Sequence, residues 1–367
     1  MERLHEVKEK LARVRLFMEN NGLKAMLIKK QPNFCWLTAG GLNMVGVATE
    51  MGVTSLLVTS SDHFVISNRI ESQRMMNEEG LASLGFKLLS YEWYEDKEVE
   101  LVKEAAGDVG IGCDVGLEGC INVDARFKEL RYELTEGEID RYLFMGGKLS
   151  TAIEKVLMDI KPEETEAEIT GRLCAELWKD RIDPVGYMAA ADERASLYRH
   201  PIPTMNKVKK YLMLCINARY KGLVTTITRL AYFGSVPESL QKQYRSNVEI
   251  ECKMIANTRI GERINLPLMT AIEEYKRIGL SEEWKLHHQG GSMGYYARDI
   301  RVTPKNTELI RKNQAFCWNP TISGTKSEDG FIVTPNGPIM ITKPVLFPNI
   351  RLEAEGFEFI RPAILSI

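Results

Sequence analysis

Histidine offers the widest range of chemistry near neutral pH, and this chain holds only five: His5, His63, His200, His287 and His288. An imidazole can exchange a proton near neutrality, or it can bind a metal ion through its lone pair. His200 lies in the segment Tyr-Arg-His-Pro-Ile-Pro, where two prolines hold the backbone extended and fix the direction of the ring. This context predicts either a surface loop histidine or a positioned proton donor and acceptor.

The adjacent pair His287 and His288 offers two further imidazoles. If this segment is a β-strand, neighbouring side chains point to opposite faces, so the two rings cannot both serve one site. The pattern then predicts one buried histidine and one that faces a cavity. The glycines that follow, Gly290, Gly291 and Gly294, favour a sharp backbone turn over a phosphate-binding loop.

Carboxylates and thiols give weaker signals. Glu328 and Asp329 in Ser-Glu-Asp-Gly form a solvated turn unless they face a cleft. The sequence has no phosphate-binding loop, no His-Glu-x-x-His motif and no Cys-x-x-Cys pair. An odd number of widely spread cysteines, seven in all, indicates reduced thiols in a cytoplasmic protein.

Composition narrows the class of partner. The chain has 367 residues, 44% of them apolar and 27% charged, and a formal net charge of −2. This balance argues against nucleic acid or an anionic membrane as the main partner. No run of about 18 apolar residues predicts a transmembrane helix, and the charged N-terminal segment lacks a signal-peptide core. We therefore expect a cytoplasmic protein whose main partner is neither nucleic acid nor an anionic membrane.

The elements that must position these residues fall into two groups. Residues 2–21 carry apolar side chains at helical spacing and end at Gly22. Short apolar runs and helical segments then alternate up to about residue 130, which predicts an α/β domain with a mixed sheet over 1–130. The predicted strands are 24–28, 52–59, 64–67, 88–94 and 109–114, and the predicted helices are 69–79 and 97–106.

The second group begins with two capping boxes. Thr135 with Glu138, and Thr165 with Glu168, each predict the start of a helix, which we expect to end near 159 and 180. Blocks of strands with intervening helices follow, which predicts an α+β domain over 131–367. The predicted strands are 211–217, 222–233, 314–319 and 328–342, the last with a tight turn at Asn336-Gly337, and the predicted helices are 236–257 and 268–278.

Five segments in the same order resemble motifs of the creatinase/prolidase/aminopeptidase P superfamily, peptidase family M24. They are 160–169, 215–229, 287–295, 317–322 and 328–337. The segment 33–40 resembles a further motif of the N-terminal domain, so the resemblance covers essentially the whole chain. It implies a creatinase/prolidase-type α/β domain over 1–130 and a "pita-bread" α+β domain over 131–367.

The peptidases of this family bind two divalent metal ions through Asp, Asp, His, Glu and Glu. The matching positions here are Cys215, Thr226, Gly291, Asn319 and Glu328. Only one carboxylate survives, and it cannot offset the charge of two divalent ions. The resemblance therefore implies a member without the family's dimetal centre, and we expect no metal and no other cofactor.

Two other positions resemble creatinase, a member that works without metal. His200 matches the histidine that serves creatinase as acid and base, and Arg298 matches the arginine that binds the substrate carboxylate. The glutamates that grip the guanidinium of creatine are replaced by neutral Thr228 and Asn319, which argues against creatine as the substrate.

These positions predict a metal-independent hydrolase for a C–N bond in a small carboxylate-bearing substrate, such as an amide, a lactam or a ureido acid. We expect His200 to exchange the proton, Arg298 to hold the carboxylate, and Glu328 or Asp329 to orient water or a substrate N–H. The expected pocket residues are Thr226, Thr228, Asn319, His288 and Cys215.

Other interpretations stay open. The chain could bind a peptide or metabolite without catalysis, or be a divergent metal-dependent Xaa-Pro peptidase. It could also hold a single zinc ion through His200, Cys215 and one of His287 or His288. The resemblance further implies a homodimer in which the small domain reaches the partner's cleft. Phe34 and Trp36 are candidate wall residues, with core packing as the alternative role for at least one of them.

Overall fold

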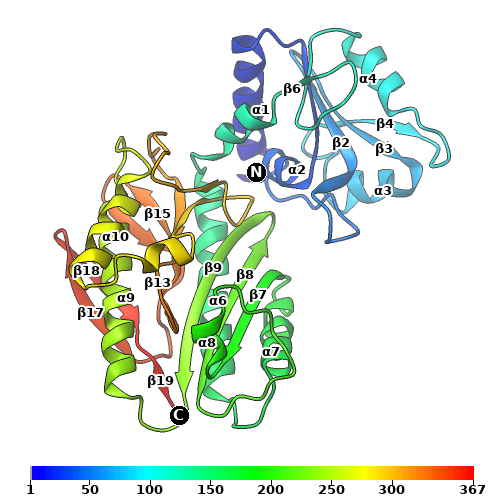
Figure 1. Cartoon of the computed structure of the whole chain (residues 1–367). Helices are drawn as coiled ribbons and strands as arrows, with labels where there is room; N and C mark the ends of the chain where they lie inside the picture. Colours follow the sequence, from blue (N-terminus) through cyan, green and yellow to red (C-terminus); the bar gives the residue numbers. More distant parts are fainter. Residues whose placement is uncertain (1) are drawn as a thin grey trace. The chain divides into compact units, whose positions relative to one another are not determined.

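A computed structural model describes residues 2–367 (Figure 1). The chain forms two compact units: unit 1 comprises 1–138 with 221–223, and unit 2 comprises 139–220 with 224–367. The division lies in the first turn of α6 (Glu136–Met158), whereas the sequence placed it at 130. The first turn of α6 belongs to unit 1 because Glu138 forms a buried ion pair with Lys10, 2.8 Å long. Among residues 2–367, no helix is both long and apolar enough to cross a membrane.

Unit 1 is an α/β structure built on one mixed sheet, as the sequence predicted. The strand order is β4-β3-β2-β1-β5-β6, with antiparallel pairing of β1 with β2 and of β2 with β3, and parallel pairing elsewhere. The strands are β1 (Ala25–Lys30), β2 (Met51–Thr59), β3 (His63–Asn68), β4 (Lys87–Tyr91), β5 (Ile111–Cys113) and β6 (Ile121–Asn122). The helices are α1 (Glu2–Asn20), α2 (Gln31–Leu37), α3 (Arg69–Asn77), α4 (Glu98–Ala106) and α5 (Asp124–Phe127), followed by the 3-10 helix η1 (Lys128–Arg131).

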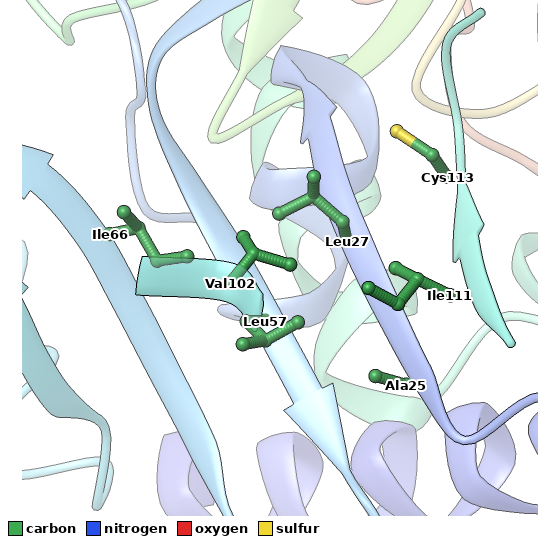
Figure 2. Packing of buried hydrophobic residues seen from close by; sticks show 7 residues of the cluster. All are labelled: Ala25, Leu27, Leu57, Ile66, Val102, Ile111 and Cys113. Carbon is green, nitrogen blue, oxygen red and sulfur yellow. The ribbon is translucent and has the colours of Figure 1, made fainter. Parts of the chain in front are cut away.

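The core of unit 1 lies between this sheet and α4. Leu27, Leu57, Ile66 and Ile111 project from four neighbouring strands and meet Val102 of α4 (Figure 2). Each of these side chains is at most 3% exposed. Burial of this apolar surface is the main term that stabilises the unit.

The structure corrects the roles predicted for Phe34 and Trp36. Both lie in α2, a short helix with Pro32 in its first turn, which the sequence analysis did not predict. Both side chains are 0% exposed, and Trp36 packs edge-on against Phe127 with 5.8 Å between ring centroids. Neither residue can line a cleft, because their rings are enclosed in the core of unit 1.

The helices of unit 2 confirm the predictions from the capping boxes. Thr165 starts α7 (Glu166–Trp178), where Glu168 N–H donates to Thr165 Oγ1 (3.1 Å) and Thr165 N–H donates to Glu168 Oε2 (2.8 Å). Thr135 and Glu138 form the same reciprocal pair at the start of α6. The other helices are α8 (Arg194–Leu197), α9 (Glu238–Ala256), α10 (Leu266–Arg277) and the 3-10 helix η2 (Glu283–Leu286).

Unit 2 is built on a nine-stranded sheet with the path β11-β10-β12-β15-β9-β8-β7, on which β16 pairs with β15 and β19 pairs with β9. These strands are β7 (Asp183–Ala191), β8 (Tyr211–Tyr220), β9 (Leu223–Tyr232), β10 (Gly290–Met293), β11 (Ile300–Arg301), β12 (Ala315–Trp318), β15 (Asp329–Thr334), β16 (Gly337–Met340) and β19 (Leu365–Ser366). Two separate hairpins are formed by β13 (Thr321–Ile322) with β14 (Thr325–Lys326), and by β17 (Asn349–Ala354) with β18 (Phe357–Pro362). The predicted α+β class is confirmed, whereas β7, β10 and the β17–β18 hairpin were not predicted.

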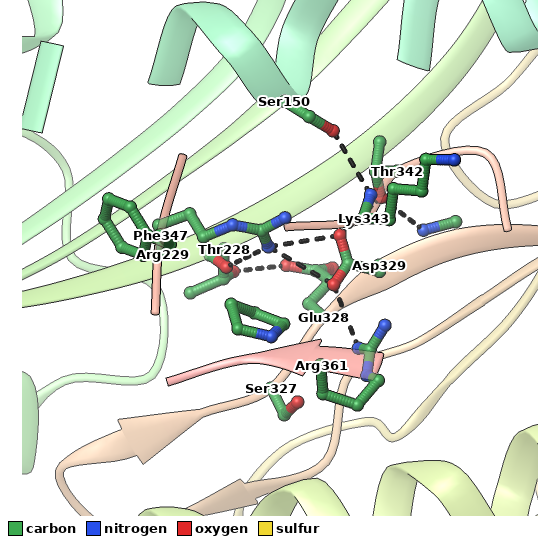
Figure 3. A network of polar contacts seen from close by, with 12 residues as sticks. Ser150, Thr228, Arg229, Ser327, Glu328, Asp329, Thr342, Lys343, Phe347 and Arg361 are labelled. Carbon is green, nitrogen blue, oxygen red and sulfur yellow. Dashed lines mark hydrogen bonds and ion pairs between the residues drawn. The ribbon is translucent and has the colours of Figure 1, made fainter. Parts of the chain in front are cut away.

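A buried ion network fixes the centre of this sheet (Figure 3). Asp329 at the start of β15 accepts from Arg229 of β9 (3.1 Å) and from Arg361 of β18 (3.0 Å). Arg229 also binds Glu154 of α6 (2.8 Å), and Arg361 binds Glu251 of α9. All five side chains are fully buried. The network therefore joins two strands, a hairpin and two helices around one carboxylate.

Removal of Arg361 should destabilise unit 2 strongly. We expect Arg361→Met to lower the free energy of unfolding by about 3–5 kcal/mol, because Glu251 and Asp329 each lose a buried counter-charge. Urea denaturation measures this change. The matched control is Arg351→Met, since Arg351 pairs with Glu358 at the surface, and it should cost less than about 1 kcal/mol. Equal losses in the two variants would contradict a structural role for the network.

Candidate active site

Glu328 stands at the centre of the candidate site and is held by two cations. Its Oε2 atom accepts from Lys326 Nζ at 2.7 Å, and its Oε1 atom accepts from Arg298 at 3.2 Å. Thr228 Oγ1 donates to Oε2 at 2.7 Å, and Cys215 Sγ lies 3.3 Å from the same oxygen. The Glu328 and Lys326 side chains are 1% and 3% exposed, and Arg298 is 11% exposed. One buried carboxylate is thus shared between two cations.

Neighbouring strands of the sheet bring these residues together. Cys215 lies on β8, Thr226 and Thr228 lie on β9, and Glu328 directly precedes β15. Side chains two residues apart on a strand share a face, so Thr226 and Thr228 project to the same side. Thr226 Oγ1 donates to Asn217 Oδ1 on β8 at 2.7 Å.

The same alternation removes Asp329 from the site, contrary to the sequence prediction. Glu328 and Asp329 are adjacent and point to opposite faces, as do Thr228 and Arg229 on the paired strand. Thr228 consequently meets Glu328, while Arg229 meets Asp329 (Figure 3). Asp329 is fully buried and bound by Arg229 and Arg361, so it cannot orient water or substrate.

The charges set the protonation of the site. Burial by itself raises the pKa of Glu328, but the positive charges of Lys326 and Arg298 bring that pKa down to about 2. Burial and the nearby carboxylate of Glu328 raise the pKa of the Cys215 thiol to about 12. Glu328 is therefore an anion, and a poor proton donor, at neutral pH, while Cys215 is a neutral thiol. Glu328 holds the two cations in place, and its low pKa makes it a weak base.

Gly291 and Asn319 occupy two of the positions that the sequence analysis matched to metal ligands of the family, and both are uncharged. Any side chain at Gly291, on β10, would collide with the carbonyl oxygen of Ile300 on β11. Asn319 follows β12 and is 2% exposed, and its Oδ1 atom has no hydrogen-bond partner among the described residues.

Three histidines form a second cluster, on the loops of unit 2. One ring nitrogen of each of His200, His287 and His288 lies within 4.8 Å of the others. His200 Nε2 and His287 Nε2 are 3.0 Å apart, and the His287 and His288 rings stack at 4.4 Å. The expectation that His287 and His288 point apart is wrong, because they lie in the loop between η2 and β10 and not in a strand.

Burial and nearby cations keep these imidazoles neutral. Burial and the charge of Lys326 lower the pKa of His287 to about 2, and burial with the charge of Arg298 lowers that of His288 to about 3. The pKa of His200, the exposed member, is lowered by burial and then by Lys326. The carboxylate of Glu328 acts in the opposite direction on all three histidines and raises their pKa values, so both charge types of the Glu328 site influence the cluster.

Sequence reasoning missed Lys326 and Cys317. Lys326 Nζ lies 3.6 Å from Cys215 Sγ, and Cys317 Sγ lies 3.8 Å from Glu328 Oε1. A signal for Lys326 was present, because it precedes Glu328 by two residues on an extended segment, where both side chains share a face. No sequence signal indicated Cys317, since its contact depends on the pairing of β12 with β15.

Comparison with known proteins identifies the family. The sequence model of "Metallopeptidase family M24" matches residues 146–347, more than half of the chain. The chain belongs to family M24.

Individual M24 relatives are distant in sequence. A Xaa-Pro dipeptidase of Pyrococcus horikoshii is 22% identical over 365 residues, which cover 91% of this chain and 97% of the relative. An uncharacterized peptidase of Staphylococcus haemolyticus is 24% identical over 242 residues, 62% of this chain and 67% of the relative.

Solved structures share the fold over nearly the whole chain. Dipeptidase PepE from Mycobacterium ulcerans superposes with a TM-score of 0.78 at 16% identity and covers 99% of both chains. The N-terminal domain of FACT complex subunit SPT16 from chickpea reaches 0.69 at 12% identity, covering 93% of this chain and 97% of that one. The predicted α/β and pita-bread architecture is confirmed.

The M24 dimetal centre does not fit the residues present here. The five ligand positions hold a neutral thiol, a threonine hydroxyl, a glycine, an amide and one carboxylate already bound by two cations. Lys326 Nζ contacts two of these positions, Cys215 and Glu328. Two divalent ions at these positions would be repelled by the positive charges of Lys326 and Arg298. A single carboxylate, Glu328, would have to offset the charges of both ions and both side chains. A buried lysine thus provides positive charge beside the M24 ligand positions.

Loss of Glu328 should cost more stability than loss of Lys326. We expect Glu328→Gln to lower the free energy of unfolding by about 3–5 kcal/mol, because it leaves two cations without their shared carboxylate. Lys326→Met should cost at most about half as much, because the pair of Arg298 with Glu328 stays intact. Urea denaturation at neutral pH gives both values. A larger loss of unfolding free energy in Lys326→Met than in Glu328→Gln would contradict the interpretation that Lys326 and Arg298 share the Glu328 carboxylate.

The stability that Glu328 contributes should disappear in acid. Its pKa falls from an ordinary value of 4.5 to about 2 on folding, so its contribution is complete above about pH 4.5 and is lost as the pH falls towards 2. We therefore expect the difference in unfolding free energy between wild type and Glu328→Gln to shrink steadily below pH 4.5. Urea titrations at several pH values measure this difference, and a constant difference down to pH 3 would exclude a lowered pKa.

Proposed function

We propose that this M24 chain is a hydrolase that cleaves a C–N bond in a small carboxylate-bearing substrate without the family's dimetal centre. The observation that carries the proposal is the sharing of Glu328 between Lys326 and Arg298. These three groups sum to one positive charge, and that excess favours an anionic ligand over a metal ion.

Arg298 is the group placed to bind the substrate carboxylate. It donates through one terminal nitrogen to Glu328 and through the other to the carbonyl of Ala297, and its Nε atom has no hydrogen-bond partner. The Arg298 side chain is 11% exposed, against 1% for Glu328, so of this pair Arg298 is the one with a solvent-facing part. A planar guanidinium suits a carboxylate by two parallel contacts.

Neutral side chains surround Glu328 on strands β8 and β9. Thr226 and Thr228 donate their hydroxyl protons to Asn217 and Glu328, which leaves their oxygen lone pairs free to accept. The Cys215 thiol is neutral. These neutral groups suit an amide, a lactam or a ureido acid, whose N–H groups donate hydrogen bonds, better than a cationic substrate.

His200 is the group that handles the proton. Its ring is exposed and is supported by His287 at 3.0 Å. In the proposed reaction, the oxygen of water bonds to the carbonyl carbon and the C–N bond breaks. His200 takes a proton from the water and delivers it to the leaving nitrogen.

Turnover by chelator-treated protein tests this function. The substrates are N-carbamoyl and N-acyl amino acids and lactam acids, each paired with the analogue in which a carboxamide replaces the carboxylate. We expect turnover without added metal, with kcat/KM at least about tenfold lower for the uncharged analogues.

Two variants assign the roles. Arg298→Met should raise KM about 10–100-fold through the loss of charged hydrogen bonds, and His200→Asn should lower kcat by about 10²–10⁴. Arg245→Met, which removes an exposed arginine of α9, is the control for net charge. Hydrolysis of Xaa-Pro dipeptides that requires added divalent metal would instead favour the Xaa-Pro dipeptidase activity named for the Pyrococcus horikoshii relative. Ligand binding with no turnover would favour a non-catalytic protein.

A further inference from the structure

The His200, His287 and His288 cluster has the composition of a metal site. One nitrogen from each ring lies within 4.8 Å of the others, and the two Nε2 atoms of His200 and His287 are 3.0 Å apart. Three ligands around a tetrahedral ion at about 2.0–2.1 Å lie little more than 3 Å from each other. Small rotations of the rings therefore suffice to close the cluster on one ion.

Contacts behind the histidines hold their two loops together. Arg199, next to His200, pairs with Glu283 of η2 at 3.0 Å. Glu283 also accepts from Ser323, which binds it through both the backbone N–H (3.0 Å) and the hydroxyl (2.8 Å). Gln289 donates to the carbonyl of His287 at 2.7 Å. The histidines are thus positioned by partners that are not themselves ligands.

The rings have uncommitted nitrogens. His287 is 6% exposed, and the buried Nδ1 atoms of His287 and His288 have no hydrogen-bond partner. A polar atom buried without a partner is uncommon in a folded protein, so Nδ1 of His288 is a candidate ligand atom, whereas His287 would bind through the Nε2 atom that lies beside His200. His200 is exposed, so an ion can enter from solvent and keep an open coordination position.

We propose that His200, His287 and His288 bind one transition-metal ion of the zinc class. Three imidazoles without a carboxylate favour Zn²⁺, Ni²⁺ or Cu²⁺ over Mg²⁺, Ca²⁺ or Mn²⁺. The site uses none of the five M24 ligand positions. Cys215 is not part of this cluster, and its Sγ atom is engaged with Glu328 at 3.3 Å.

The ion and the proposed reaction compete for one atom. A bound ion takes the lone pair of His200 that the hydrolysis uses to accept a proton, so the two roles exclude each other in time. The metal site itself does not depend on the proposed hydrolysis, and its test measures no turnover.

Metal titration of the whole chain tests the site. Protein stripped with a chelator is titrated with Zn²⁺ in competition with a chromophoric chelator, and with Co²⁺ to record visible absorption. We expect one ion per chain, a Kd of about 1 µM or tighter, and the intense absorption of a tetrahedral Co²⁺ site. His200→Gln and His288→Gln should each weaken Zn²⁺ binding at least about 100-fold.

Matched variants separate this site from others. His5→Gln removes an exposed histidine of α1 and should leave the affinity unchanged, as should Cys215→Ser at an M24 ligand position. Circular dichroism confirms that each variant is folded, and His200, being exposed, is the safest position to change. The proposal is overturned if wild type binds less than about 0.1 ion per chain at micromolar metal. It is equally overturned if His200→Gln binds as wild type does, or if Cys215→Ser loses binding.

Discussion

A single carboxylate shared by two cations determines the chemistry of this site. Glu328 keeps Lys326 and Arg298 charged although all three side chains are largely buried, and the two cations in turn keep Glu328 ionised. Each group would be costly to bury alone. Because the carboxylate can neutralise only one of the two cations, positive charge is left over inside the fold. That excess disfavours metal ions at the family positions and attracts anions.

The sheet keeps this charged site apart from a second, structural network. Thr228 and Glu328 face one side of the sheet, while the next residues of both strands, Arg229 and Asp329, face the other. The second face is filled by ion pairs that are fully buried and serve only to hold helices and strands together. Such a rigid support fixes the positions of the groups on the first face, which is what a site that binds by electrostatics requires.

The elements that could be predicted from sequence are those specified by local signals. The capping boxes at Thr135 and Thr165 place the helix starts because donor and acceptor lie within one turn. The roles of Phe34 and Trp36 could not be predicted, since the sequence segment does not show that α2 packs into its own core.

Within the site, the residue types were predicted better than their partners. Alignment with the family motifs predicted which ligand positions hold neutral residues. It also predicted that Arg298 belongs to the site. The spacing of Lys326 and Glu328 places both side chains on one face, but the contacts that make this pair part of a site, with Arg298 and Cys215, come from distant segments and are not local information. The two adjacent histidines converge because their loop departs from strand geometry, which the run of polar residues does not reveal.

The dimetal ligands are absent from positions where the surrounding backbone and charges would also oppose them. The collision of a side chain at position 291 with the Ile300 carbonyl means that a histidine there requires the β10–β11 pair to move. A carboxylate restored at position 215 would face Lys326 and would pair with it instead of with a metal ion. The remaining groups able to exchange protons or bind an ion lie on loops beside the sheet, at His200, His287 and His288. In the proposed function, the proton is therefore handled by an imidazole on a loop and not by a carboxylate of the sheet, and Arg298 is the proposed anchor.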